Sequence, residues 1–207
     1  MLSFDPRLAN TRQPGRLRQF LRLLAALIAL TTLAPLAWVS SAYVSRTLST
    51  PVLFAPRSDR DLLLVSLTDT SPELAAVPGP LAVRPGEKAL RVPLTSRPYA
   101  GVSLDEPSAD WRGYRSLHID VMNSTRSELP LHIRLQDRFH NGNVSDRFEA
   151  LERLAPGTRR VIDIPLDRVA AGPRTRALDL AQVSGVYLYK AGGEGAREMW
   201  LGRIWLQ

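Results

Sequence analysis

The sequence of 207 residues predicts an all-β fold, an antiparallel β-sandwich of the jelly-roll type, preceded by one N-terminal transmembrane helix. Two observations carry this prediction. From residue 61 onward, short apolar or alternating runs are separated by turns rich in proline and glycine, and no stretch has the length and periodicity of a crossover helix. Before that point, the run from Leu23 to Val44 contains no charged residue.

The charge-free run is long enough to cross a membrane, because about 20 apolar helical residues span a hydrocarbon core of about 30 Å. Five arginines precede it, and the first cation after it is Arg46. The positive-inside rule therefore predicts a cytoplasmic N-terminus and an extracytoplasmic C-terminal part. We expect a cytoplasmic tail over residues 1–16 and a single-pass membrane anchor over residues 17–45.

A cleaved signal peptide is the alternative interpretation of this segment. Such peptides combine a basic start, a shorter apolar stretch and small residues at the cleavage site, and Ser40, Ser41 and Ala42 would suit cleavage after Ala42. The apolar run continues past that length, however, and Trp38 and Tyr43 suit an aromatic belt at the outer interface. The anchor is therefore favoured, and both interpretations export the folded part.

Residues 46–60 mix serine, threonine and proline and are expected to form a linker, which leaves residues 61–207 for the sandwich domain. Each predicted strand is a short apolar or alternating run bounded by turn residues. The expected strands are 61–67, 89–94, 100–104, 116–123, 131–137, 145–154, 159–166, 185–190 and 197–207. Residues 176–183 could form a short helical turn or an extended segment.

The composition excludes several classes of function. The net charge is +7, but residues 1–22 contribute five arginines against one aspartate, so most of it is an orientation signal. No compact basic cluster interleaved with aromatic residues occurs in the folded part, and no nucleic-acid partner is expected. Cysteine is absent, which excludes thiol catalysis, thiolate zinc sites and disulfide chemistry.

The second half of the chain resembles a known family. The motif Asp110–Tyr114 leads into the strand 116–123, a polar strand follows at 131–137, the turn Leu154–Gly157 precedes another strand, and the chain ends on WLGRIWL. This order resembles the galactose-binding-like β-sandwich of non-catalytic carbohydrate-binding modules. It is also similar to the C-terminal extracytoplasmic domain of some VanZ-like bacterial membrane proteins, although those have several membrane spans. The resemblance implies a binding function.

Alternation in two strands locates a candidate binding surface. If Leu117, Ile119 and Val121 face the core, the residues between them face outward, and the same holds for 131–137. If the two consecutive strands pair, their outward polar side chains form one patch suited to sugar hydroxyls. This patch consists of His118, Asp120, His132, Arg134 and Gln136. The plainer interpretation is a solvated sheet face, which is normal in antiparallel sandwiches.

A sugar site usually also needs an aromatic ring. The candidate rings are Trp111, Tyr187, Tyr189, Trp200 and Trp205, of which Trp111 and Tyr187 are the predicted ligand contacts. Trp111 and Tyr114 lie in a polar loop, where a plug over one end of the core is the favoured interpretation. Trp200 and Trp205 should face opposite sides of a regular strand, unless Gly202 marks a bulge.

Metal binding and catalysis have little support in the sequence. Asp137, Asn141, Asn143 and Asp146 supply oxygen ligands that suit Ca²⁺, but their spacing is not that of an EF-hand loop and nearby arginines would repel a cation. We expect no metal and no cofactor. The sequence has no nucleophile elbow, no zinc-protease motif and no phosphate-binding loop, so we expect a protein that is not an enzyme.

The expected function is therefore a membrane-anchored, extracytoplasmic binding module that recognises carbohydrate, for example an envelope glycan. The alternative is a protein-interaction or assembly module in a bacterial envelope complex, without sugar binding. The expected location is the bacterial inner membrane, with the C-terminal domain in the periplasm or outside the cell.

Overall fold

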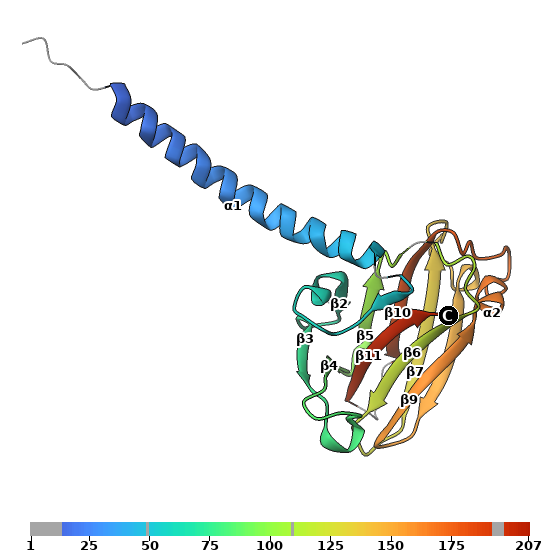
Figure 1. The fold of residues 1–207 in the computed structure, drawn as a ribbon. Coiled ribbons are helices and arrows are strands. Elements are labelled where there is room, and N and C mark those ends of the chain that lie inside the picture. Colours follow the sequence, from blue (N-terminus) through green and yellow to red (C-terminus); the bar gives the residue numbers. More distant parts are fainter. Residues whose placement is uncertain (1–13, 49, 109, 192–196) are drawn as a thin grey trace, which may run out of the picture. The chain divides into compact units, whose positions relative to one another are not determined.

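The computed structural model describes residues 14–48, 50–108, 110–191 and 197–207. The chain divides into two compact units, residues 1–41 and 42–207. Because the expected cytoplasmic tail lies mostly outside the described residues, it stays a prediction. Figure 1 shows a single long helix followed by a domain built of strands.

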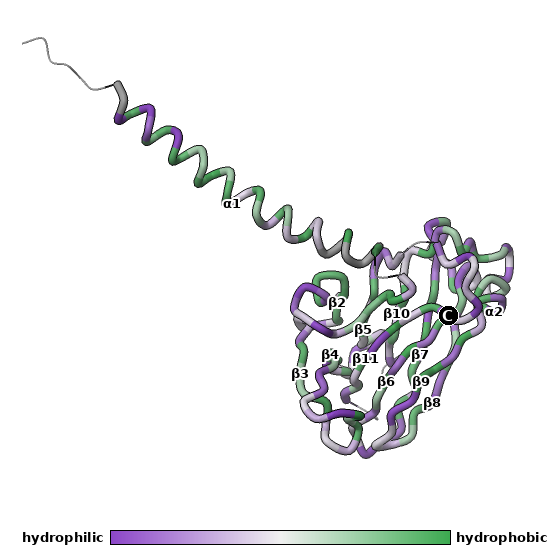
Figure 2. The backbone as a smooth tube through the Cα atoms, viewed as in Figure 1, coloured by the Kyte–Doolittle hydropathy of each residue, from purple (hydrophilic) through white to green (hydrophobic). Residues whose placement is uncertain are grey.

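The helix α1 (Pro14–Leu48) contains the candidate span Arg16–Ser41, within which an 18-residue window has a mean hydropathy of 2.0 and no buried residue. Figure 2 shows hydrophobic residues along most of its length. The hydroxyls of Thr31 and Thr32 donate to the carbonyls of Leu27 and Ile28 at 2.9 and 2.8 Å, so these polar groups are satisfied inside the helix. The helix is long and apolar enough to cross a membrane, although a signal sequence has the same features.

The second unit is an antiparallel β-sandwich, which confirms the predicted fold class. Its first sheet has the order β3-β4-β11-β6-β9, with β1 also paired to β11, and its second sheet has the order β2-β5-β10-β7-β8. The strands are β1 (Val52–Phe54), β2 (Val65–Leu67), β3 (Glu73–Ala76), β4 (Lys88–Pro93), β5 (Pro98–Asp105), β6 (Ser116–Asn123), β7 (Leu129–Asp137), β8 (Phe148–Leu154), β9 (Thr158–Pro165), β10 (Val183–Ala191) and β11 (Glu198–Leu206).

The core lies between the two sheets and follows from period-two alternation. Leu117, Ile119 and Val121 on β6 and Leu131, Ile133 and Leu135 on β7 are fully buried in it, as their spacing predicted. Their neighbours in sequence consequently face outward from the sandwich. Two outer faces result, one on each sheet, and any surface site must be built on one of them or on the connecting loops.

The strands β10 and β11 hold the centre of both sheets. In the second sheet β10 pairs with β5 on one side and β7 on the other, and in the first sheet β11 pairs with β4 and β6. Without these two strands, the described ladders reduce to the pairs β3-β4, β6-β9, β2-β5 and β7-β8.

Several predicted elements differ from the structure. Residues Asp61–Leu64 form a short 3₁₀ helix, η2, and only Val65–Leu67 of the predicted first strand is extended. The strand β1 lies inside the range predicted as linker, because Leu53 and Phe54 bury their side chains in the core. The sequence interpretation also missed β3 and the short helix α2 (Leu166–Ala170). Residues 176–182 are irregular.

The expected pairing of strands 116–122 and 131–137 is wrong. The strand β6 pairs with β11 and β9, whereas β7 pairs with β10 and β8, so the two strands belong to different sheets. Alternation shows which side chains face the core. Because both sheets contribute to the same core, it does not show to which sheet a strand belongs. The turn between β6 and β7 therefore crosses from one sheet to the other.

Candidate functional site

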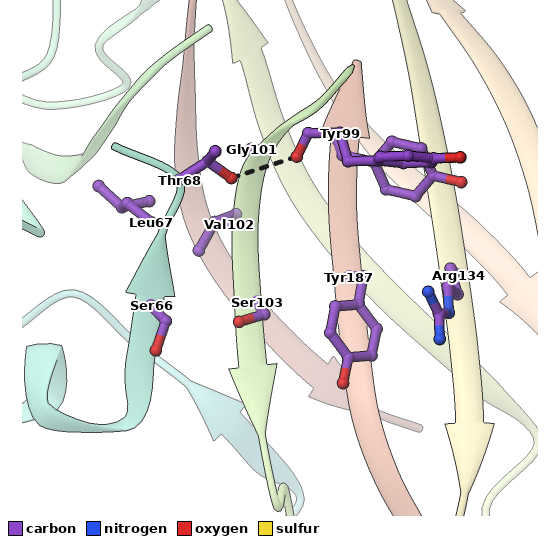
Figure 3. Close-up of a pocket in the computed structure, with 10 residues that line it drawn as sticks. Ser66, Leu67, Thr68, Tyr99, Gly101, Val102, Ser103, Arg134 and Tyr187 are labelled. Atoms are coloured by element: carbon purple, nitrogen blue, oxygen red, sulfur yellow. Dashed lines mark hydrogen bonds between the residues drawn. The ribbon is translucent and has the colours of Figure 1, made fainter. Parts of the chain in front are cut away.

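The outer face of the second sheet carries a hollow of about 220 Å³. Its lining comes from β2, β5, β7 and β10 and includes three tyrosines, Tyr99, Tyr187 and Tyr189, beside Arg134, Ser103 and Thr68. Figure 3 shows the rings of Tyr99 and Tyr187 and the guanidinium of Arg134 on this face. The site is therefore built on strands, which hold side chains more rigidly than loops do.

Strand register places these side chains in transverse rows. Arg134 on β7 is opposite Tyr187 on β10, which is opposite Ser103 on β5, which is opposite Ser66 on β2. The next row places His132 opposite Tyr189 and Tyr189 opposite Gly101. Neighbouring rows on one face lie within reach of long side chains, so the two rows form one surface.

Tyr99 reaches this surface because of an irregularity in β5. The β10 register passes from Lys190↔Ala100 to Ala191↔Pro98, which leaves Tyr99 without a partner on β10. Its φ is 63°, a left-handed conformation that a tyrosine adopts only at a cost of about 1–3 kcal/mol. The bulge re-aims the side chain, whose ring lies 5.3 Å from that of Tyr189 at an angle of 59° and is 63% exposed.

Three side chains hold Tyr189 in place: Tyr99, His132 and Glu149. Its ring stacks on His132 at 5.1 Å, and its hydroxyl donates a short hydrogen bond to Glu149 on β8. Burial, followed by the hydrogen bond to Glu149, raises the pKa of Tyr189, so the hydroxyl stays protonated. Burial would raise the pKa of Glu149, but the hydrogen bonds from Tyr189 and Arg147 outweigh it and leave this pKa lowered.

Arg134 connects the first row to neighbouring polar groups. Its guanidinium lies over the Tyr187 ring at 4.9 Å and donates to Gln136 Oε1 at 2.5 Å and to His140 Nε2 at 3.2 Å. His140 Nδ1 is 2.9 Å from the carbonyl of Asp146, so the tautomer with the proton on Nδ1 satisfies both contacts. Burial, followed by the charge of Arg147, lowers the pKa of Arg134.

The Tyr187 ring lies over Gly185. A Cβ built on Gly185 would be 2.5 Å from a carbon of this ring, so only glycine leaves room for it. The Tyr187 hydroxyl accepts a hydrogen bond from Gln136 at 3.1 Å. Burial, followed by the charge of Asp105, raises the pKa of Tyr187. Asp105 in turn accepts hydrogen bonds from the hydroxyls of Ser103 and Ser66 at 3.1 and 3.4 Å.

The structure divides the predicted site residues between two faces. His132, Arg134, Gln136 and Tyr187 lie together on the outer face of the second sheet. His118 and Asp120 lie on the outer face of the first sheet, because β6 belongs to that sheet. The single patch expected from pairing β6 with β7 does not form, and its two halves face away from each other.

On the outer face of the first sheet, the predicted residues are engaged in packing and ion pairs. His118 stacks on Trp205 at 5.0 Å, and the guanidinium of Arg203 lies over the same indole ring at 4.1 Å. Asp120 accepts hydrogen bonds from Arg159 at 3.0 and 2.6 Å. The guanidinium of Arg159 also binds Glu87 at 3.0 Å, and these two bonds raise the pKa of Arg159.

Two tryptophans considered as ligand contacts are buried. Trp111 is 0% exposed in the main core, and its indole N–H donates to the Ser108 carbonyl at 2.6 Å, which corrects its assignment to the binding surface. Trp200 packs with Val77, Leu81, Ala89 and Met122 under a short 3₁₀ helix, η3 (Gly79–Leu81). The register of β11 shifts between Leu201 and Ile204, so Trp200 and Trp205 face the same side.

The oxygen-rich turn after β7 is organised around an arginine. Asp137 accepts hydrogen bonds from Arg176 at 2.5 and 2.7 Å, and Asp146 accepts one from the same guanidinium at 2.6 Å. These bonds occupy both carboxylates that were considered as calcium ligands. Among the described residues, no group of three or more His, Cys, Asp or Glu side chains is placed to hold a metal ion.

Comparisons with known proteins show the fold. No protein-family model and no curated protein matches the sequence. An exo-β-agarase structure is similar with a TM-score of 0.58 and 17% identity, over 75% of this chain and 24% of that chain. A family 11 carbohydrate-binding module from Clostridium thermocellum, solved with a β-1,3-1,4-mixed-linked tetrasaccharide, is similar with a TM-score of 0.51 and 13% identity, over 75% of this chain and 93% of that one.

The chain thus spans about a quarter of the agarase and nearly all of the binding module. Its second unit has the β-sandwich fold found in carbohydrate-binding modules, as the sequence resemblance predicted. The similarity to VanZ-like membrane proteins stays a prediction.

Sequence reasoning missed Tyr99, His140 and Glu149, together with the small lining residues Ser66, Thr68 and Ser103. The pair Pro98-Tyr99 directly before a predicted strand was a usable signal, because an aromatic residue at a strand start often faces a sheet surface. His140 and Glu149 reach the site from the turn after β7 and from β8, and only the three-dimensional register shows this.

Proposed function

We propose that the protein is a membrane-anchored carbohydrate-binding module that acts by recognition and not by catalysis. The observation that carries this proposal is the hollow on the outer face of the second sheet, where the exposed ring of Tyr99 and the half-buried ring of Tyr187 lie beside polar side chains. The fold, shared with carbohydrate-binding modules, supports it but does not by itself specify a ligand.

The chemistry of the hollow suits a sugar. Pyranose rings present C–H faces that pack on aromatic rings, and the exposed ring of Tyr99, supported by the buried ring of Tyr189, offers such a surface. Sugar hydroxyls need fixed donors and acceptors around these faces. Arg134 and Gln136 supply donors at one side of Tyr187, and Asp105 supplies an acceptor at the other.

The proposed anchor is the apolar part of α1, with the N-terminus in the cytoplasm and the sandwich in the periplasm or outside the cell. The span Arg16–Ser41 and the arginines before its apolar run support this orientation. If the segment is instead removed after Ala42, the protein would be a secreted binding module. Mass spectrometry of the mature N-terminus and alkaline extraction of membranes distinguish the two forms.

Glycan binding by the full-length protein in a non-ionic detergent tests the proposal. We expect a soluble glycan from a panel of plant, algal and bacterial envelope polysaccharides to bind, as measured by isothermal titration calorimetry or affinity electrophoresis. Tyr189→Ala removes the buried ring that supports Tyr99 and lines the hollow, and should weaken binding at least tenfold.

Trp205→Ala is the matched control, because it removes a partly exposed ring from the opposite face. It should leave binding unchanged. A folded protein that binds no glycan of the panel would overturn the proposal, and a loss of binding in Trp205→Ala but not in Tyr189→Ala would show that the site is elsewhere.

The assembly-module alternative predicts an exposed apolar patch. Leu151, opposite His132 in register, is exposed next to the hollow, but the surrounding side chains are polar or charged. The lining therefore favours sugar over an apolar protein partner. In-membrane crosslinking from position 151 would reveal a stable partner, and a specific crosslinked protein together with no glycan binding would favour the alternative.

A further inference from the structure

We propose that the ligand of the hollow is an acidic glycan, and that Arg134 binds a carboxylate of its uronic acid residues. This inference rests on the proposed function and narrows it to a class of ligand. It follows from the charges around the hollow and from the hydrogen bonds that each of them makes.

Arg134 is a partly buried cation that forms no ion pair with any residue of the described ranges. Its acceptors are neutral, the amide oxygen of Gln136 and Nε2 of His140. Its Nε is enclosed and has no hydrogen-bond partner among the described residues. A buried charge without a counter-charge is costly, and the lowered pKa of Arg134 reflects this cost.

The carboxylate of Glu149 forms no ion pair with Arg134. Glu149 is its register partner on β8, but the Glu149 carboxylate is bound by Arg147 at 3.1 Å and by the Tyr189 hydroxyl. Arg147 and Glu149 thus compensate each other. Arg134 remains as an additional positive charge at this side of the hollow.

Asp105, at the far side of the Tyr187 ring, is in a different situation. Hydroxyls of Ser66 and Ser103 donate to its carboxylate, so it is solvated by the protein. A bound sugar hydroxyl could add to these donors without a change of charge. The two sides of the hollow therefore favour different groups of one ligand, a carboxylate near Arg134 and neutral hydroxyls near Asp105.

A guanidinium matches a carboxylate better than an ammonium does, because it presents parallel N–H groups in one plane. The Tyr187 ring below Arg134 holds this plane in place. The sugar ring that carries the carboxylate would then lie toward Tyr189 and Tyr99, on the neighbouring row. Recognition of charge and of ring shape would come from adjacent strands.

The test compares polygalacturonate and alginate with the same polymers after chemical reduction of their carboxyl groups, using the full-length protein in a non-ionic detergent. We expect at least one acidic polymer to bind at least tenfold more tightly than its reduced form, and added NaCl to weaken only the binding of the acidic form. Arg134→Met should abolish this preference, and Arg134→Lys should retain part of it.

Arg203→Met is the matched control, because it removes the same charge from the opposite face. If it weakens acidic binding as much as Arg134→Met does, binding reflects overall charge and the inference fails. If reduced and acidic polymers bind equally, the inference fails while the proposed function stands. If no glycan of either kind binds to the folded protein, both fail. Thermal unfolding and near-UV circular dichroism establish that each variant is folded.

Discussion

The two outer faces of the sandwich are made of similar residues but differ in how far they are covered and in how their charges are paired. Each has an aromatic side chain flanked by arginine, acid and histidine. On the first sheet, residues 77–82 cover Trp200, and Arg159 is paired with two carboxylates. On the second sheet, the tyrosines border an open hollow and Arg134 has neutral acceptors only. The comparison teaches that charge compensation and coverage, more than residue type, distinguish the structural face of the first sheet from the proposed binding face of the second.

The cover of the first sheet is held by one guanidinium. Arg159 on β9 binds Asp120 on β6, Glu87 before β4, and the Leu81 carbonyl of η3 at 3.1 Å. It therefore ties the covering segment to two strands of the sheet. On the second sheet, the described residues that line the hollow include no segment that covers it in the way residues 77–82 cover Trp200.

The largest expected effect is on the first sheet. Arg159→Met would leave two mostly buried carboxylates without their ion-pair partner, and we expect the free energy of unfolding to fall by about 3 kcal/mol. Glycan binding by the folded fraction should not change. Urea unfolding followed by tryptophan fluorescence measures the loss. The exposed pair Arg91–Glu198 provides the control, since Arg91→Met should cost less than about 1 kcal/mol.

Gly185→Ala should have a smaller effect on stability and a clear effect on binding. The added Cβ would overlap the Tyr187 ring and force it to move, at a cost of about 1–2 kcal/mol. We expect several-fold weaker glycan binding in calorimetry. Gly79→Ala is the matched control on the first sheet, because a Cβ at Gly79 meets nothing within 4 Å and should change neither property.

Acid should destabilise the covered face in a way that depends on Arg159. The hydrogen bond from Arg159 lowers the pKa of Glu87 below its unfolded value, which is about 4.3. This stabilisation is present above that pH and is lost as the pH falls through the lower folded pKa. Denaturant titrations between pH 6 and pH 3 should show a shallower loss of stability in Arg159→Met. An unchanged slope would show that other carboxylates dominate.

The smallest expected effect concerns the bulge at Tyr99. Tyr99→Gly removes an exposed ring and also relieves the positive φ, so stability should stay the same or rise by up to about 1 kcal/mol. Binding should weaken nonetheless. A parallel loss of stability and binding would indicate that Tyr99 is a packing residue and not part of the recognition surface.

The sequence was sufficient to predict the sandwich, the apolar helix and the inward face of most strands, because all of these depend on local periodicity. It could not assign strands to sheets. His118 and His132 have the same alternation pattern but lie on opposite faces, because β6 pairs with β11 in one sheet and β7 pairs with β10 in the other. Tertiary packing, which local periodicity does not encode, determines these pairings. Tyr99 escaped prediction because a bulge breaks the period-two rule on which the interpretation depended.

The central position of β10 and β11 has a consequence for folding kinetics. Until these strands pair, the remaining ladders are two-stranded ribbons, which are at best marginally stable in water. Both sheets must then close through contacts between segments far apart in sequence, a topology that folds slowly and cooperatively. The strands before residue 183 therefore form no stable intermediate on their own. A chain with this topology stays largely unfolded until β10 and β11 are available, and then folds in one cooperative step.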